Sequence, residues 1–131
     1  MQTENKKVLL IEDEESVLNI IERYLEKADV TVLRALNGKV GLEVALQEKP
    51  HLILLDLRLP VMNGIIFLEE LRKDSWGKEA IVVTLTNDPT EEAVNVTKHL
   101  GIKEYIVKSN WPMEVALNRA LVFIGKKINI A

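Results

Sequence analysis

The sequence has no cysteine among its 131 residues. Disulfide bonds, zinc–thiolate sites and thiol catalysis are therefore excluded, and a reducing cytoplasm is a permitted environment. Glycine and proline are sparse, with six and four residues, so the chain is neither collagen-like nor of low complexity. Since 47% of its residues are hydrophobic and its length suits one domain, we expect a single domain over residues 1–131.

The chain also lacks a large excess of charge of either sign. Lysine and arginine number 17 and aspartate and glutamate 20, a formal net charge of −3 that argues against broad binding to a nucleic acid backbone. The first hydrophobic run, residues 8–11, has only four residues, too few for a signal peptide or a membrane span. We therefore expect a cytoplasmic protein with no direct nucleic acid or membrane partner.

What the sequence does contain is an alternation of two patterns. Short apolar runs, each typical of a strand buried on both faces, lie at residues 8–11, 30–33, 52–55, 80–83 and 105–107. Apolar residues at helical spacing follow each run. Buried strands joined by helices predict an α/β fold: a five-stranded parallel sheet, doubly wound, with helices on both faces.

Turn-forming residues indicate where the helices begin and end. We expect helix starts at Asn37-Gly38, Asn63-Gly64, Asp88-Pro89-Thr90 and Trp111-Pro112, and a helix end at Gly101.

Polar side chains follow the ends of four of the expected strands. They are Glu12 and Asp13, then Asp56, then Thr86, and finally Lys108. Because the carboxyl ends of parallel strands lie along one edge of a sheet, we expect these side chains to converge. Clustered carboxylates repel one another, and an oxygen-rich set without cysteine or histidine suits Mg²⁺. The pattern indicates a phosphoryl-transfer site.

Two other kinds of site fit less well. A nucleotide-binding loop needs glycines after the first strand, whereas residues 12–15 are all acidic. An aspartate-based phosphatase needs a second carboxylate two residues after Asp56, and that residue is Arg58. A metal-dependent phosphohydrolase that uses Asp56 remains the enzymatic alternative.

With these residues in this order, the sequence resembles the receiver domain of two-component response regulators. The resemblance covers residues 7–126 and rests on four segments: 9–14, 54–64, 82–87 and 105–108. It implies a flavodoxin-like (βα)5 fold with strand order 2-1-3-4-5. It also implies a signalling domain that is not an enzyme, apart from catalysing its own phosphorylation and slow dephosphorylation.

The resemblance also implies roles for individual residues. Asp56 would be the phosphoacceptor, while Thr86 and Lys108 would bind the phosphoryl group. Thr86 and Tyr105 would act as a switch that changes the surface of the fourth helix, the fifth strand and the fifth helix. That change would support partner binding or a phosphorelay.

For the metal, the resemblance implies that Asp13, Asp56 and the backbone carbonyl of Arg58 bind Mg²⁺ directly and that Glu12 acts through water. Arg58 and Asp88 occupy two variable positions beside the phosphoryl pocket. We expect them to pair across this pocket and to tune the lifetime of the phosphorylated state.

The implied donor is a sensor histidine kinase or a histidine phosphotransfer protein. The implied recipient is a downstream protein target or a missing output domain, since no output domain is expected within residues 1–131. The protein would be a monomer or a phosphorylation-dependent homodimer.

Two residues depart from the family pattern. Ser109 stands where proline usually follows the lysine, and Asn87 replaces a small residue after the threonine. Either the bond before Ser109 is trans or other contacts hold it, because a cis bond before a residue other than proline costs about 2.5–4 kcal/mol. These departures favour a third possibility, a receiver-like domain that binds partners without phosphorylation.

Overall fold

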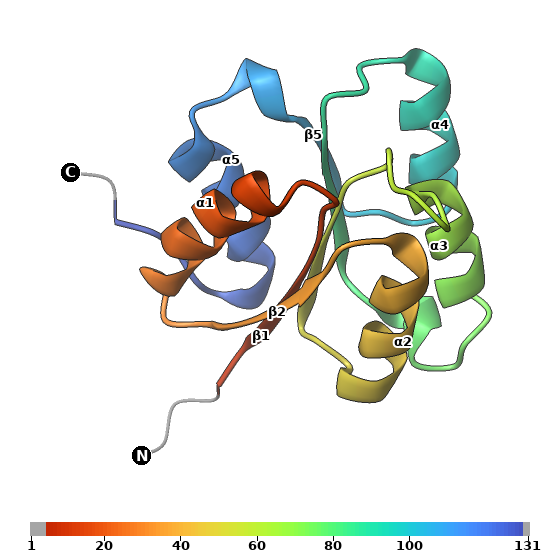
Figure 1. The fold of residues 1–131 in the computed structure, drawn as a ribbon, viewed down its shortest axis with the longest axis horizontal. Helices are drawn as coiled ribbons and strands as arrows, with labels where there is room; N and C mark the ends of the chain where they lie inside the picture. Colours follow the sequence, from red (N-terminus) through yellow and green to blue (C-terminus); the bar gives the residue numbers. More distant parts are fainter. Residues whose placement is uncertain (1–4, 130–131) are drawn as a thin grey trace.

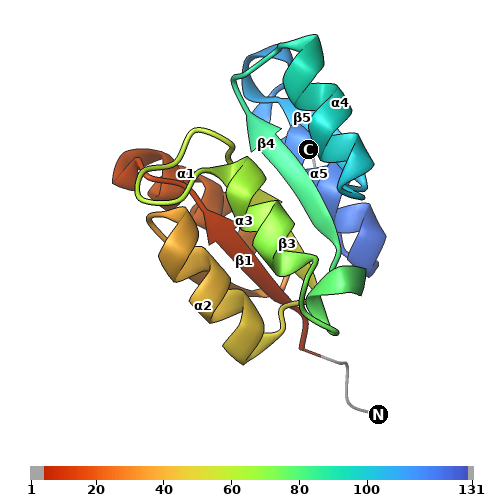
Figure 2. The ribbon, with the colours of Figure 1, turned by 90° about the vertical axis from the view of Figure 1, so that its right-hand side faces the viewer.

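The computed structural model describes residues 5–129, so the ends of the expected domain, residues 1–4 and 130–131, lie outside the described part. Its strands form one parallel sheet in the order β2-β1-β3-β4-β5, as Figures 1 and 2 show from two sides. The strands are β1 (Lys7–Ile11), β2 (Thr31–Ala35), β3 (Leu52–Leu55), β4 (Val82–Thr86) and β5 (Glu104–Val107). The expected fold and strand order are confirmed.

Helices cover both faces of the sheet. They are α1 (Glu15–Glu26), α2 (Gly38–Glu48), α3 (Gly64–Leu71), α4 (Glu91–His99) and α5 (Met113–Leu121), with short 3₁₀ turns η1 (Gly77–Glu79), η2 (Lys108–Asn110) and η3 (Val122–Ile124). Helices α1 and α5 lie on one face, and α2, α3 and α4 on the other (Figures 1 and 2). Within residues 5–129, every helix is too short or too polar to span a lipid bilayer.

The two faces of the sheet carry two separate hydrophobic cores. In β1, Val8 and Leu10 pack with α1 and α5, whereas Leu9 and Ile11 pack on the side of α2 and α3. All four side chains are buried, and each fully buried side chain of this size stabilises the fold by about 1.5–3 kcal/mol. Because successive side chains point to opposite faces, a strand covered on both sides is a continuous apolar run.

The helices begin at the expected turn residues. The side chains of Asn37, Asn63 and Thr90 accept hydrogen bonds from the backbone N–H groups of the first turns of α2, α3 and α4. Such caps satisfy donors that have no partner within the helix. Pro112 precedes α5, and Gly101 follows α4 with a φ of +80°, a conformation that favours glycine.

Three strand predictions were wrong in detail. Strand β4 begins two residues later than expected and continues through Thr84 to Thr86. Threonine can extend the strand because its β-branched side chain fits a pleated sheet. Strand β2 is displaced toward Ala35. In addition, β2 and β5 are not buried on both faces: they are the edges of the sheet, and most of their side chains are only partly buried.

Candidate functional site

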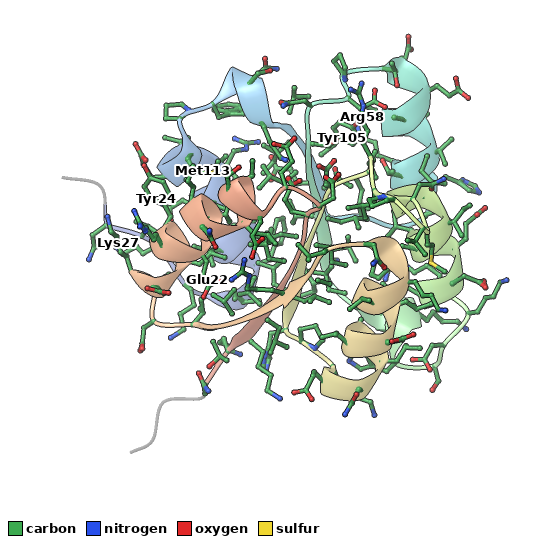
Figure 3. All side chains as sticks on the ribbon, in the orientation of Figure 1. Glu22, Tyr24, Lys27, Arg58, Tyr105 and Met113 are labelled. Carbon is green, nitrogen blue, oxygen red and sulfur yellow. The ribbon has the colours of Figure 1, made fainter. Side chains whose placement is uncertain are left out.

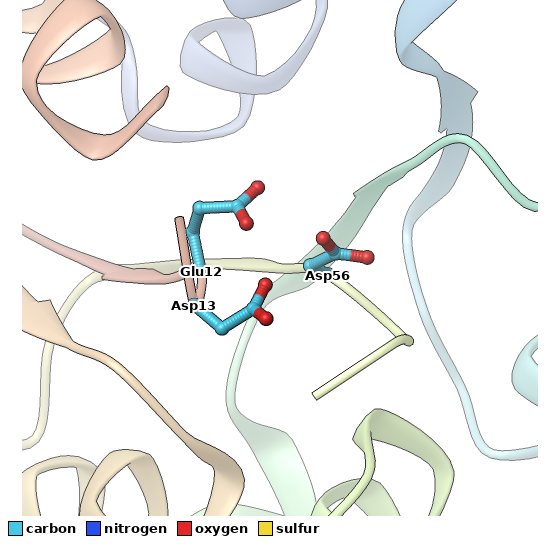
Figure 4. A group of neighbouring side chains, drawn as sticks. All are labelled: Glu12, Asp13 and Asp56. Atoms are coloured by element: carbon cyan, nitrogen blue, oxygen red, sulfur yellow. The ribbon is translucent and has the colours of Figure 1, made fainter. Parts of the chain in front are cut away.

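Three carboxylates meet where β1 and β3 end. Glu12 and Asp13 follow β1, Asp56 follows β3, and the two strands are paired neighbours. The backbone N–H of Asp56 donates a 3.1 Å hydrogen bond to Ile11, which extends the pairing to the acidic residues. One oxygen from each carboxylate lies within 4.8 Å of the others, and Figure 4 shows the three side chains next to one another.

Lys108 compensates part of this negative charge. Its ammonium group forms an ion pair with Glu12 and lies 3.4 Å from Asp56 Oδ2. Burial alone would lower the pKa of Lys108, but the hydrogen bond to Glu12 and the two nearby negative charges raise it above its usual value. Burial raises the pKa of Glu12, although the bond to Lys108 opposes this shift. The ammonium is therefore held in its charged form beside Asp56.

Thr86 contacts the same carboxylate from the neighbouring strand. It is the last residue of β4 and fully buried, and its hydroxyl donates a 2.9 Å hydrogen bond to Asp56 Oδ1. The backbone N–H of Arg58 donates to the same oxygen at 3.1 Å. The two oxygens of Asp56 thus differ, since Oδ1 accepts two hydrogen bonds and Oδ2 faces the ammonium of Lys108.

A chain of hydrogen bonds connects Thr86 to Tyr105 on β5. The Thr86 hydroxyl oxygen accepts a 3.3 Å bond from the backbone N–H of Asp88. The hydroxyl of Tyr105 in turn donates to the backbone carbonyl of Asp88. Burial raises the pKa of Tyr105 to about 12, with a further contribution from the charge of Asp88. Tyr105 is therefore a neutral donor near neutral pH, joined to Asp56 through Asp88 and Thr86.

A cavity of about 220 Å³ opens at this cluster. Its lining residues are Asp13, Glu14, Asp56, Arg58, Asn87 and Lys108. Mixed charges line the cavity, which suits a small anion held together with a cation.

The expected pair of Arg58 and Asp88 does not form. Both residues line a neighbouring groove of about 560 Å³, but no ion pair joins them in the part of the chain that the structure describes. The Asp88 carboxylate instead accepts a 2.9 Å hydrogen bond from the backbone N–H of Thr90, which lowers its pKa, and the charge of Arg58 adds to this shift. Figure 3 shows Arg58 on the same side of the molecule as Tyr105.

The structure also shows contacts that the sequence analysis missed. The Asn87 side chain accepts a 3.1 Å hydrogen bond from the backbone N–H of Ser109, and the backbone N–H of Glu14 donates to Glu12 Oε2 at the same distance. The described residues contain no cis peptide bond, so the bond before Ser109 is trans. The sequence feature that could have indicated the contact between Asn87 and Ser109 is their position, because each directly follows a predicted site residue.

The donor set fits a hard cation. Glu12, Asp13 and Asp56 offer only carboxylate oxygens, and Mg²⁺ is bound in proteins through one or two carboxylates together with carbonyl groups, water and phosphate oxygens. Arg58, whose carbonyl is the expected further ligand, lines the same cavity.

Comparisons with known proteins agree on one family. Residues 8–117 match the family described as "Response regulator receiver domain". The alkaline phosphatase synthesis transcriptional regulatory protein PhoP of Bacillus subtilis is 32% identical over 111 residues, which are 85% of this chain and 45% of that protein. The chain therefore spans about half the length of the curated relatives it matches.

Solved structures give the same result. The chemotaxis response regulator CheY4 of Vibrio cholerae has a TM-score of 0.82 and 26% identity, and the match covers 92% of this chain and 99% of that one. The BeF3-activated N-terminal receiver domain of RstA from Klebsiella pneumoniae has a TM-score of 0.82, 30% identity and the same coverage.

Proposed function

Because the chain belongs to the response regulator receiver domain family, we propose that it accepts a phosphoryl group on Asp56 from a phosphohistidine donor. The observation that carries the proposal is the position of the Asp56 carboxylate. It accepts a hydrogen bond from Thr86, faces the ammonium of Lys108, and lies beside two further carboxylates. The carboxylate can act as the nucleophile toward phosphorus, and the neighbouring hydroxyl and cation can stabilise charge on the transferring phosphoryl group.

In the proposed reaction, an oxygen of Asp56 attacks the phosphorus atom of the donor and forms an acyl phosphate. The bond between phosphorus and the donor imidazole nitrogen breaks, and the nitrogen keeps the electron pair. Lys108 would then pair with a phosphoryl oxygen as it now pairs with Asp56, and the Thr86 hydroxyl would donate to another.

We propose that Mg²⁺ is held by Asp13, Asp56 and the backbone carbonyl of Arg58, with Glu12 acting through water. When bound, Mg²⁺ would neutralise negative charge on the phosphoryl oxygens. The support is the oxygen-only donor set, whose three carboxylates lie within reach of one ion. The ammonium of Lys108 offsets only one of the three negative charges. A bound cation would therefore also relieve the repulsion among the carboxylates.

We further propose that phosphorylation changes the surface formed by α4, β5 and α5. When Thr86 bonds to a phosphoryl oxygen, its bond to Asp56 is lost. Because Thr86 is linked to Tyr105 through Asp88, a displacement of Thr86 is expected to change the position of Tyr105. The altered surface would bind a downstream target or pass the signal on in a phosphorelay.

The proposed partners are a sensor histidine kinase or histidine phosphotransfer protein as donor, and a downstream protein or output domain as recipient. Residues 1–131 would work as one receiver unit, as a monomer or a phosphorylation-dependent homodimer, in the cytoplasm and without direct nucleic acid or membrane contact. We propose that the domain is not a multiple-turnover enzyme. A phosphatase of this type needs a second, acid–base carboxylate two residues after Asp56, and that residue is Arg58.

Intact mass spectrometry after incubation with acetyl phosphate tests the proposal. We expect a single phosphoryl adduct that requires Mg²⁺, disappears with a chelator and is absent from an Asp56→Asn variant. Asp29→Asn is the matched control, because its side chain is 95% exposed and belongs to the turn after α1. This control should form the adduct as the wild type does.

Three results would contradict the proposal. An adduct on Asp56→Asn would move the acceptor to another residue. Multiple turnover of a small phosphate ester would favour the phosphohydrolase. The absence of both an adduct and any thermal stabilisation by fluoroberyllate would favour a domain that binds partners without phosphorylation.

A further inference from the structure

The loops that carry Thr86 and Lys108 are joined by one hydrogen bond beyond the ends of their strands. Asn87 directly follows Thr86, and Ser109 directly follows Lys108. The strands pair up to Thr86 and Val107, where their register ends. Beyond that pair, one residue after Thr86 and two after Val107, the backbone N–H of Ser109 donates to Asn87 Oδ1 at 3.1 Å. A side chain thus continues the connection that the backbone no longer makes.

We propose that Asn87 is a positioning residue that holds the backbone at Lys108, so that its ammonium stays between Glu12 and Asp56. This inference rests on the proposed function, because the ammonium matters only if Asp56 receives a phosphoryl group. The name "loop clasp" is used below for the bond between Asn87 and Ser109.

The short turn that begins at Lys108 gives the backbone there only weak support. Lys108 begins η2, a turn of three residues, and the backbone bond from Trp111 to Lys108 that closes it is 3.5 Å long. A lysine side chain has a flexible stem, and ordering it costs conformational entropy. Holding its backbone reduces the positions that the ammonium group can reach.

The loop clasp depends on the two departures from the family pattern. Proline at position 109 would have no N–H to donate, and a small side chain at position 87 would have no oxygen to accept. Serine and asparagine together supply both halves of the bond. Both residues are exposed, so the bond is expected to contribute more to the position of Lys108 than to the stability of the whole fold.

Variants on both sides of the loop clasp test the inference. The readout is the initial rate of Asp56 phosphorylation by acetyl phosphate, measured by intact mass. Asn87→Ala removes the acceptor and Ser109→Pro removes the donor, so each is expected to slow phosphorylation by about two- to tenfold. Ser109→Ala is the matched control, because alanine keeps the backbone N–H, and its rate should stay within about twofold of the wild type.

Two further measurements separate positioning from a general structural effect. The affinity for Mg²⁺ should change by less than about twofold in Asn87→Ala, since the carboxylates follow β1 and β3. In a Lys108→Ala background, Asn87→Ala should slow phosphorylation no further, because no ammonium remains to be positioned. Thermal unfolding of each variant verifies that it is folded.

Several outcomes would overturn the inference: a wild-type rate in folded Asn87→Ala, a Ser109→Ala variant as slow as Ser109→Pro, or an undiminished effect of Asn87→Ala in the Lys108→Ala background. If the wild type is phosphorylated normally, any of these outcomes removes the loop clasp and leaves the proposed function intact. If the wild type forms no adduct, the proposed function is wrong and the loop clasp falls with it.

Discussion

The hydroxyl of Thr86 donates a 2.9 Å hydrogen bond to Oδ1 of Asp56, across 30 residues of sequence. The bond forms because β3 and β4 are neighbours and both end at the same edge of the sheet. Thr86 is fully buried and belongs to its strand, so the sheet itself determines where the hydroxyl lies. The proposed acceptor and a proposed phosphoryl ligand are thus placed by two neighbouring inner strands of the sheet.

Mg²⁺ should stabilise the protein through Asp13. At a Mg²⁺ concentration ten times its Kd, the free energy of unfolding should rise by about 1.4 kcal/mol, since a ligand that binds only the folded state adds RT ln(1 + [L]/Kd). Thermal unfolding with and without Mg²⁺ measures this gain. Asp13→Asn should lose most of it and Asp29→Asn should retain it; equal gains in the two variants would exclude Asp13 as a ligand.

Tyr105 should ionise late in an alkaline titration. Its pKa in the folded protein is about 12, against an ordinary value of 10.0, because burial disfavours the phenolate. The folded state therefore holds this proton more tightly than the unfolded state, and the resulting contribution to stability is fully present below pH 10 and lost as the pH rises through 12. Tyrosinate absorbance of wild type minus that of Tyr105→Phe isolates the step. A difference centred near pH 10 would contradict the prediction.

Gly64→Ala should disturb both stability and the acceptor. A Cβ atom at Gly64 would lie 2.7 Å from the backbone oxygen of Asp56 and from Leu57 Cα, and crowding of this kind costs about 1–3 kcal/mol. Chemical denaturation should show that loss, and acetyl phosphate should modify the variant more slowly because Asp56 is displaced. Glu69→Ala, at an exposed position of the same helix, is the control. An unchanged stability in Gly64→Ala would refute the predicted crowding.

Val61→Asn should make the protein more stable. Val61 has a φ of +68° and is 77% exposed, so a β-branched residue adopts a left-handed conformation without burying its side chain. This conformation costs an L-residue about 1–2 kcal/mol, and asparagine tolerates it better. We expect a gain of about 0.5–1 kcal/mol in the free energy of unfolding by chemical denaturation. Val61→Ile keeps the β-branch and should show no gain in the free energy of unfolding. A lower free energy of unfolding in Val61→Asn would contradict the predicted backbone strain at Val61.

Arg58→Ala should change the lifetime of the phosphorylated state. Arg58 lines the cavity beside Asp56 and the groove that it shares with Asp88, where its side chain can limit the access of water to an acyl phosphate. We expect faster loss of the phosphoryl group, by about two- to tenfold, when the adduct is followed by intact mass after the phosphodonor is removed. Lys39→Ala, an exposed cation on α2, is the control. An unchanged lifetime in Arg58→Ala would remove its tuning role.

The sequence by itself determined the architecture, because each layer leaves a local pattern. Continuous apolar runs such as residues 52–55 identify strands covered on both faces, and Asn37, Asn63 and Thr90 mark helix starts through caps made within a few residues. The same patterns were less accurate at the edges. Strands β2 and β5 have one neighbour each, and a run of apolar residues does not reveal which strands lie at the edge.

The convergence of Glu12, Asp13, Asp56, Thr86 and Lys108 was also predictable, because parallel strands place their carboxyl ends together. Only the tertiary structure decided which atoms meet. It bonded the Asp88 carboxylate to the backbone N–H of Thr90 instead of pairing it with Arg58, linked Tyr105 to Thr86 through Asp88, and joined Asn87 to Ser109. These contacts depend on loop conformations and side-chain directions that no residue spacing encodes. Hydrogen bonds form or fail over a few tenths of an ångström, whereas strand order depends on which surfaces must be buried.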